Sequence, residues 1–250
     1  MTRTGLKPAG DSFFFAMALV SLGVGLLGFG SSFIAGVMGG MGEVPLRLHI
    51  HGAILMAWLI LLAVQAGLIT YGNRQTHRIL GRVGFAWFVL VLMSAASLSI
   101  NSLVKPVPPV IDTFILQIFF IQLTDLTIAV VLMTLALLDL RSDTQGHRRY
   151  ILMTTLALLG AAVARMPWLP GMVFEPTGPV GPLHVWHSLL FVPFVLYDLR
   201  TLGRLHRSTV IGLSLIGFFK LASFWAWHSE GWLAIARGIE AFFAPWWPVH

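Results

Sequence analysis

The 250-residue chain contains no cysteine, and only 10% of its residues are charged. Without thiols it can form neither a disulfide nor a thiolate metal site, and c-type haem attachment is excluded. A charged share so far below the roughly 25% of soluble domains argues against a water-soluble globular fold. Basic residues outnumber acidic ones by sixteen to ten. The placement of the arginines, described below, explains this excess without a nucleic-acid partner.

Apolar residues make up 57% of the chain and occur in long runs, with a mean hydropathy of +0.84. Apolar runs of about 20 residues can cross a membrane, and they do so as helices because lipid offers the backbone no hydrogen-bond partners. The runs predict a single integral membrane domain, residues 1–250, with seven spans at 12–38, 48–70, 83–104, 111–139, 151–166, 183–199 and 209–228. In the shorter stretch 231–243, apolar residues three and four apart alternate with charges, which indicates an interfacial helix.

Lysines and arginines are divided unevenly between the two sets of predicted loops. If the N-terminus lies inside, eleven fall in the inner segments and three in the outer ones. Positive residues favour the cytoplasmic side of a membrane. The sequence therefore predicts an all-α bundle of seven transmembrane helices, N-in and C-out, in a bacterial inner membrane. Its expected partners are the lipid bilayer and other membrane subunits.

Three predicted inner loops carry a related pattern. Residues 139–148 begin with Asp-Leu-Arg and end in His-Arg after five further residues, and residues 198–207 do the same. Residues 73–78 begin with Asn-Arg and also end in His-Arg. The pattern predicts three parallel helical-hairpin repeats, preceded by the first span. The loops either cap helix ends and contact anionic headgroups or form a functional site on the inner side.

Polar side chains from six predicted spans fall in one layer. At ~1.5 Å per helical residue, they lie roughly 16–27 Å from the inner boundary. Ionisable groups at this depth are costly, so they normally pair and face the bundle interior. We therefore predict a polar pocket near the outer face. Its candidate ligand-binding residues are His51, Asn101, Asp125, Arg165, His184 and His187.

Asp125 and Arg165 fall at matching depth in one hairpin and are predicted partners. Their pairing is either a structural clip between two spans or part of the pocket. Lys220 belongs to the same layer, and we expect it to form a structural pair. Pro193 predicts a kink in the sixth span, just inward of His187.

His51, His184 and His187 are the candidate metal ligands. His184 and His187 stand three residues apart and share one helix face. Neutral imidazoles can hold zinc, copper or a haem iron. Histidines that hydrogen-bond to helix ends need no metal, so the cofactor remains open between haem, a transition metal and none.

Several segments resemble, in the same order, a set of uncharacterised bacterial polytopic inner-membrane proteins with repeated His-Arg inner loops. These segments are His51-Gly52 through Trp58 and Gln65 to His77-Arg78-Ile79-Leu80-Gly81-Arg82, His147-Arg148 with Ala161-Ala162 and Arg165-Met166-Pro167, and Tyr197-Asp198 with Gly203-Arg204-Leu205-His206. The resemblance covers about spans two to seven. It implies a polytopic membrane fold and no activity.

The sequence favours a ligand- or cofactor-binding membrane protein, or an accessory subunit of a membrane complex. One alternative is a membrane-embedded metal-dependent enzyme in which Asp125 accepts a proton beside a His-bound ion. A second is a small-solute transporter, and a third is a purely structural role for the polar layer. Whether the protein is an enzyme stays open, because no Ser-His-Asp, paired-carboxylate or phosphate-loop pattern is present.

Overall fold

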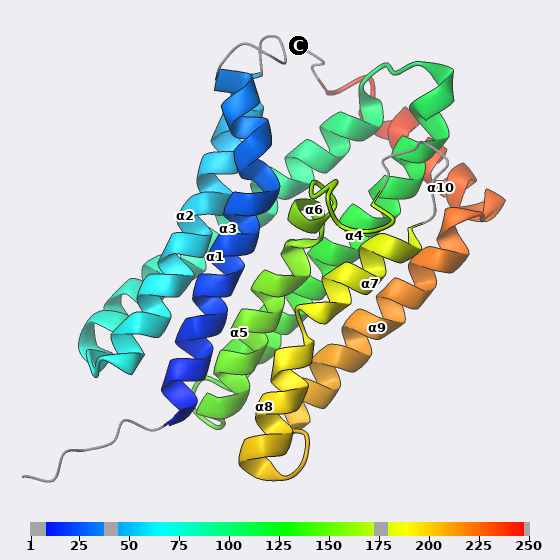
Figure 1. Cartoon of the computed structure of the whole chain (residues 1–250). Helices are drawn as coiled ribbons and strands as arrows, with labels where there is room; N and C mark the ends of the chain where they lie inside the picture. The colour runs from blue at the N-terminus through cyan, green and yellow to red at the C-terminus, as the bar shows by residue number, and fades with distance from the viewer. Residues whose placement is uncertain (1–8, 38–44, 173–179, 248–250) are drawn as a thin grey trace, which may run out of the picture. The chain divides into compact units, whose positions relative to one another are not determined.

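A computed structural model describes residues 9–37, 45–172 and 180–247, and the regular elements in these ranges are all α-helices. Figure 1 shows them in chain order from α1 to α10. The chain divides into two compact units, Met1–Val91 and Leu92–His250. Five helices within the described ranges are long and apolar enough to cross a membrane, which supports the predicted membrane character. They are α1, α2, α3, α4 and α9.

The first unit contains α1 (Ala9–Val37), α2 (Leu46–Thr70) and the beginning of α3 (Arg74–Val104). Helices α1 and α2 pack along each other. Gly67 of α2 faces the Phe15 ring of α1 so closely that a Cβ there would lie 3.3 Å from it. Small residues allow such close helix approach in lipid. Trp87 of α3 donates a hydrogen bond of 3.0 Å to the carbonyl of Ile54 in α2.

The second unit is built around α4, α5 and α9, with α5 packed along both of the others. Its elements after α3 are α4 (Pro109–Leu138), α5 (Thr144–Leu158), α6 (Gly160–Val163), α7 (Gly181–Leu189), α8 (Val192–Leu202), α9 (Arg207–Trp227) and α10 (Glu230–Phe243). The loops 139–143 and 203–206 meet at one end of this unit, where Asp198 accepts a hydrogen bond from the His206 amide. We call it the hairpin end.

Helix α10 covers the opposite end of the second unit. Trp232 is buried against Phe119 of α4 and donates to the carbonyl of Leu116 at 2.8 Å. Arg237 pairs with Asp112 in the first turn of α4. Apolar residues on the other face of α10 are exposed. The predicted amphipathic helix at 231–243 therefore forms.

Two of the seven predicted spans are each divided into two shorter helices. The span 151–166 corresponds to α5 and α6, which are separated at Leu159, and Gly160 is the first residue of α6. The span 183–199 corresponds to α7 and α8, which are separated at Leu190 and Phe191. Pro193, in the first turn of α8, has no backbone N–H to continue the helix, so the predicted kink is confirmed. Neither pair contains one helix of spanning length.

The His-Arg loops use their histidines in two different ways. His77 and His147 each bond through Nδ1 to a carbonyl of the preceding helix, to Gln65 at 3.3 Å and to Ala136 at 2.8 Å. His206 instead caps its own helix α9, accepting the Ser208 amide at Nδ1. The similar sequence patterns therefore mark helix starts but do not impose one structure.

Candidate functional site

Four segments of the second unit line one small cavity, and three of them bring ionisable side chains to it. Asp125 comes from α4, Gly160 from the break between α5 and α6, His184 and His187 from α7, and Lys220 with Ser223 from α9. The cavity measures about 20 Å³ and is lined by Asp125, Gly160, His184, His187, Lys220 and Ser223 together with apolar neighbours. A polar cavity needs roughly 10–15 Å³ to hold one water molecule. The space therefore suits a single water and is too small for haem or a solute.

His187 connects the two helix breaks. Its Nε2 lies 2.8 Å from the carbonyl oxygen of Leu156, in the last turn of α5. A carbonyl can only accept, so Nε2 carries the hydrogen, and a neutral ring then has an acceptor at Nδ1. A Cβ placed on Gly160 would lie 3.5 Å from this Nδ1 and 3.5 Å from Oδ2 of Asp125. Because Gly160 has no side chain, the imidazole and the carboxyl share the space beside it.

His184 is fixed by a short chain of hydrogen bonds to α9. Its Nε2 lies 2.5 Å from the hydroxyl oxygen of Ser223, and that hydroxyl donates to the carbonyl of Lys220 at 2.7 Å. Since the Ser223 hydrogen is already used, His184 must donate from Nε2 and keep Nδ1 as an acceptor. Both histidines of α7 therefore adopt the same tautomer when they are neutral.

Lys220 supplies the positive charge of the site. Its ammonium donates to the carbonyl of His184 at 3.2 Å and to the hydroxyl of Ser188 at 3.0 Å. Two of its three hydrogens are thus used. Lys220 also lies near enough to Asp125 for the two charges to interact. The Asp125 carboxyl accepts no hydrogen bond from the residues that the structure describes.

The structure brings three of the sequence-predicted residues to one cavity. Asp125, His184 and His187 share the cavity, as the depth argument predicts. Asn101 is buried in α3 of the same unit but does not line the cavity, and its Oδ1 has no hydrogen bond within the described residues. His51 belongs to α2 in the first unit.

The predicted partner of Asp125 was wrong. Arg165 follows α6, is exposed, and donates to the carbonyl of Ala161 at 2.8 Å. The cation near Asp125 is Lys220 of α9. Equal predicted depth indicates that two side chains lie at the same level of the membrane. It does not indicate whether they point toward each other.

The candidate metal ligands do not form a metal centre in the described part of the chain. No group of three or more His, Asp or Glu side chains there is placed to hold an ion. His184 and His187 each use Nε2 in a hydrogen bond. No chemical step is therefore assigned to a metal or a haem.

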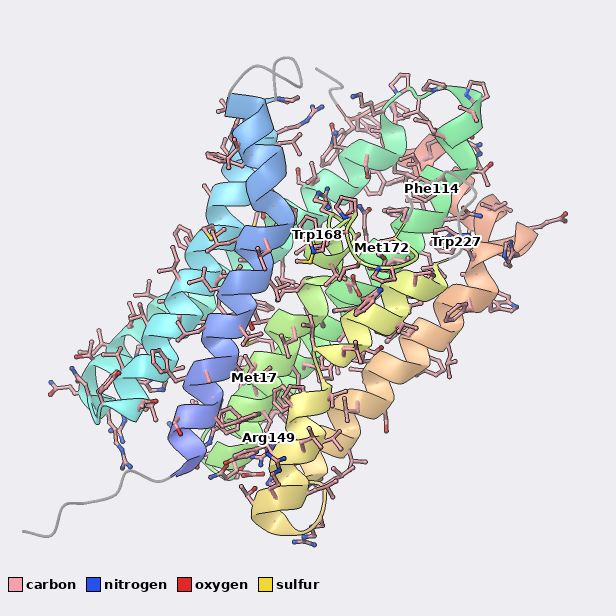
Figure 2. The ribbon with its side chains drawn as sticks, in the orientation of Figure 1. Met17, Phe114, Arg149, Trp168, Met172 and Trp227 are labelled. Carbon is pink, nitrogen blue, oxygen red and sulfur yellow. The ribbon has the colours of Figure 1, made fainter. Side chains whose placement is uncertain are left out.

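A second polar cluster lies at the hairpin end. Arg149 of α5, labelled in Figure 2, and Asp198 of α8 are 1% and 0% exposed. They form an ion pair, with Nε at 3.1 Å and Nη2 at 2.5 Å from Oδ1. The other carboxylate oxygen of Asp198 accepts the His206 amide at 2.8 Å, and Arg149 also donates to Gln145. Burial lowers the pKa of the His206 imidazole, which keeps its Nδ1 available as the cap of α9.

Sequence reasoning missed some residues of the first cluster and the buried pair of the second. Lys220 was predicted to lie in the polar layer but was not among the candidate ligand-binding residues. Gly160 has no side chain that could have indicated a site. Asp198 begins one of the loop patterns and Arg149 directly follows another, but neither residue was a candidate for a buried pair. An aspartate at the end of an apolar run, next to other helices, was the signal available for the buried pair.

Comparisons of the chain with protein families, with curated proteins and with solved structures find no match. The geometry of the site is therefore what bears on function.

Proposed function

We propose that the protein is a multi-pass inner-membrane carrier or accessory subunit whose action is coupled to protonation of Asp125. In this proposal seven spans cross the bilayer with the N-terminus inside, and α5–α6 and α7–α8 form the two discontinuous spans. The excess of inner arginines and the helical bounds support this topology. Membrane carriers commonly place their sites where spanning helices are broken.

The observation that carries the proposal is the unsatisfied Asp125 carboxyl in a water-sized cavity at two helix breaks. A water there has an acceptor at Asp125, an acceptor at Nδ1 of His187 and a donor at Lys220. Ordered buried waters make about three such hydrogen bonds. The water would connect the carboxyl with the imidazole through hydrogen bonds, so that the Asp125 proton has a bonded partner inside the cavity.

Lys220 gives this site its charge balance. With Asp125 ionised, the pair Asp125–Lys220 is neutral, and with Asp125 protonated the site carries one positive charge. Changes of charge at membrane depth are energetically large. The two helix breaks lie beside this site, so a change in its charge changes the electrostatic potential at α6, α7 and α8. We infer that protonation shifts the relative stability of two arrangements of these segments.

The test is proton uptake into vesicles containing the purified protein and an internal pH-sensitive dye, driven by an imposed membrane potential. Wild-type protein should acidify the vesicles faster than empty vesicles, and Asp125→Asn should lower that rate by roughly 10²-fold or more, as expected for a lost acid–base group. Glu230→Gln, at an exposed carboxylate, is the matched control and should leave the rate unchanged. Equal rates for wild type and Asp125→Asn would contradict the proposal.

A further inference from the structure

A larger cavity opens at the hairpin end of the second unit, and the Asp125 site does not use it. It measures about 670 Å³, within the roughly 300–1,000 Å³ typical of small-molecule sites. Its polar lining comes from both hairpin loops and the adjoining helix ends. The principal polar residues are Gln145, Arg149, Tyr197, Arg204, His206 and Arg207.

The lining carries more positive than negative charge. Arg149 is neutralised by Asp198, and the carboxylate of Asp143 lies 3.6 Å from His206 while it caps α5. Arg204 and Arg207 are exposed, and neither forms an ion pair or hydrogen bond with a described residue. Two cationic side chains at the mouth of this cavity are therefore left to attract an anion.

The backbone adds to this attraction. Helices α5 and α9 both begin at this cavity, and a helix N-terminus carries partial positive charge. Their caps, Asp143 and His206, each satisfy amides of the first turn. The arginines and the α9 N-terminus, whose cap is neutral, therefore favour a compact anion such as a phosphate group, which arginine also binds through paired hydrogen bonds.

Apolar side chains next to the arginines indicate which kind of molecule the phosphate group belongs to. Leu202 and Leu205 line the same cavity and are 47% and 36% exposed. A soluble phosphate would leave these leucines in water, whereas acyl chains would cover them. We propose that this cavity binds the phosphate headgroup of an anionic phospholipid, with Arg204 and Arg207 on the phosphate and the chains along the two leucines.

This proposal does not depend on the Asp125 site. It is tested with the full-length protein in lipid nanodiscs by measuring retention of phosphatidylglycerol against phosphatidylcholine. The double variant Arg204→Gln/Arg207→Gln should weaken phosphatidylglycerol retention about 30-fold, as expected when two arginine contacts to an anionic lipid are lost. Since both side chains are exposed, the variant should keep the thermal unfolding midpoint of the wild type.

The matched control is Arg78→Gln/Arg82→Gln, which removes two exposed arginines from the first unit. It should leave phosphatidylglycerol retention within about twofold of wild type, and raised salt should weaken the wild-type preference. Equal loss in the two double variants would overturn the proposal, because attraction would then be a property of net charge. Inorganic phosphate or glycerol phosphate binding as tightly as the lipid, with the same dependence on Arg204 and Arg207, would overturn the lipid assignment.

Discussion

The Arg149–Asp198 pair and the Asp125 site belong to the same unit, and both place charged groups among apolar helices. They differ in how fully hydrogen bonds satisfy them. Asp198 receives three hydrogen bonds, whereas Asp125 receives none from the described residues and borders a water-sized space. A satisfied buried charge holds helices in place, and a carboxyl with spare bonding capacity can exchange a proton. The comparison therefore indicates a structural role for the Arg149–Asp198 pair and favours the functional role that we propose for Asp125.

The largest expected effect comes from breaking the satisfied pair. Arg149→Met leaves Asp198 buried without its counter-charge, and we expect a loss of about 3–5 kcal/mol in unfolding free energy. Reversible unfolding in detergent, followed by tryptophan fluorescence, measures it. The double variant Arg149→Met/Asp198→Leu should regain most of that stability, because no buried charge remains. A single variant within 1 kcal/mol of wild type would show that the pair does not hold the helices.

Alanine substitutions at two glycines compare the free space beside Asp125 with the space at a tightly packed helix contact. A Cβ on Gly212 of α9 would collide with the thioether end of the fully buried Met153, so Gly212→Ala should cost about 1–3 kcal/mol. A Cβ on Gly160 would only reach ordinary contact distance, 3.5 Å, from Asp125 and His187. Gly160→Ala should therefore change unfolding free energy by less than about 1 kcal/mol while it fills the water space. A larger loss for Gly160→Ala than for Gly212→Ala would reverse this interpretation.

The hydrogen bond from His187 to Leu156 should make an intermediate contribution. His187→Leu leaves that carbonyl without its side-chain donor and should cost about 1–2 kcal/mol in the same unfolding measurement. His187→Gln can still donate from its amide and should lose less. Both variants remove the titratable nitrogen beside Gly160, so both should slow proton uptake. If His187→Gln took up protons at the wild-type rate, the imidazole would have no part in proton transfer.

The smallest expected effect is a pH dependence at the cap of α9. Because burial lowers the pKa of His206 below its ordinary value of 6.5, the unfolded chain binds this proton more readily than the folded one. The stability from the neutral cap is present above pH 6.5 and declines as the pH falls through the lowered pKa, by about 1 kcal/mol or less. His206→Asn keeps a capping oxygen and should remove this part of the decline. The same acid loss in His206→Asn would exclude His206 as its source.

The positions of the helices could be predicted from the sequence because apolar runs and their boundaries directly reflect the length of a buried helix. The C-terminal helix at 231–243 and the bend at Pro193 followed from periodicity and from proline chemistry. The split at Leu159 could not be predicted, because no local pattern marks it; beside it, the Leu156 carbonyl bonds to His187 of another helix. The five long helices support membrane character, whereas the seven-span count remains a proposal.

The site could be predicted only as a level along the helices. The depths estimated from the sequence placed Asp125, His184 and His187 at one level. In the structure these three residues line the same cavity. Depth gave the wrong counter-charge for Asp125, because Arg165 lies in the turn after α6 and bonds to the carbonyl of Ala161, whereas Lys220 of α9 is the cation that interacts with the carboxyl. The fit of Gly160 between a carboxyl and an imidazole depends on packing that no local pattern encodes.

The most direct test of the Asp125 site is infrared difference spectroscopy of the protein in lipid as the pH is changed. The carbonyl stretch of a protonated carboxylic acid should appear in the wild type, shift on exchange into D₂O, and be absent from Asp125→Asn but retained in Glu230→Gln. Gly160→Ala should alter that band by excluding the neighbouring water. An identical set of carboxyl bands in wild type and Asp125→Asn would contradict the assignment of Asp125 as the protonated group.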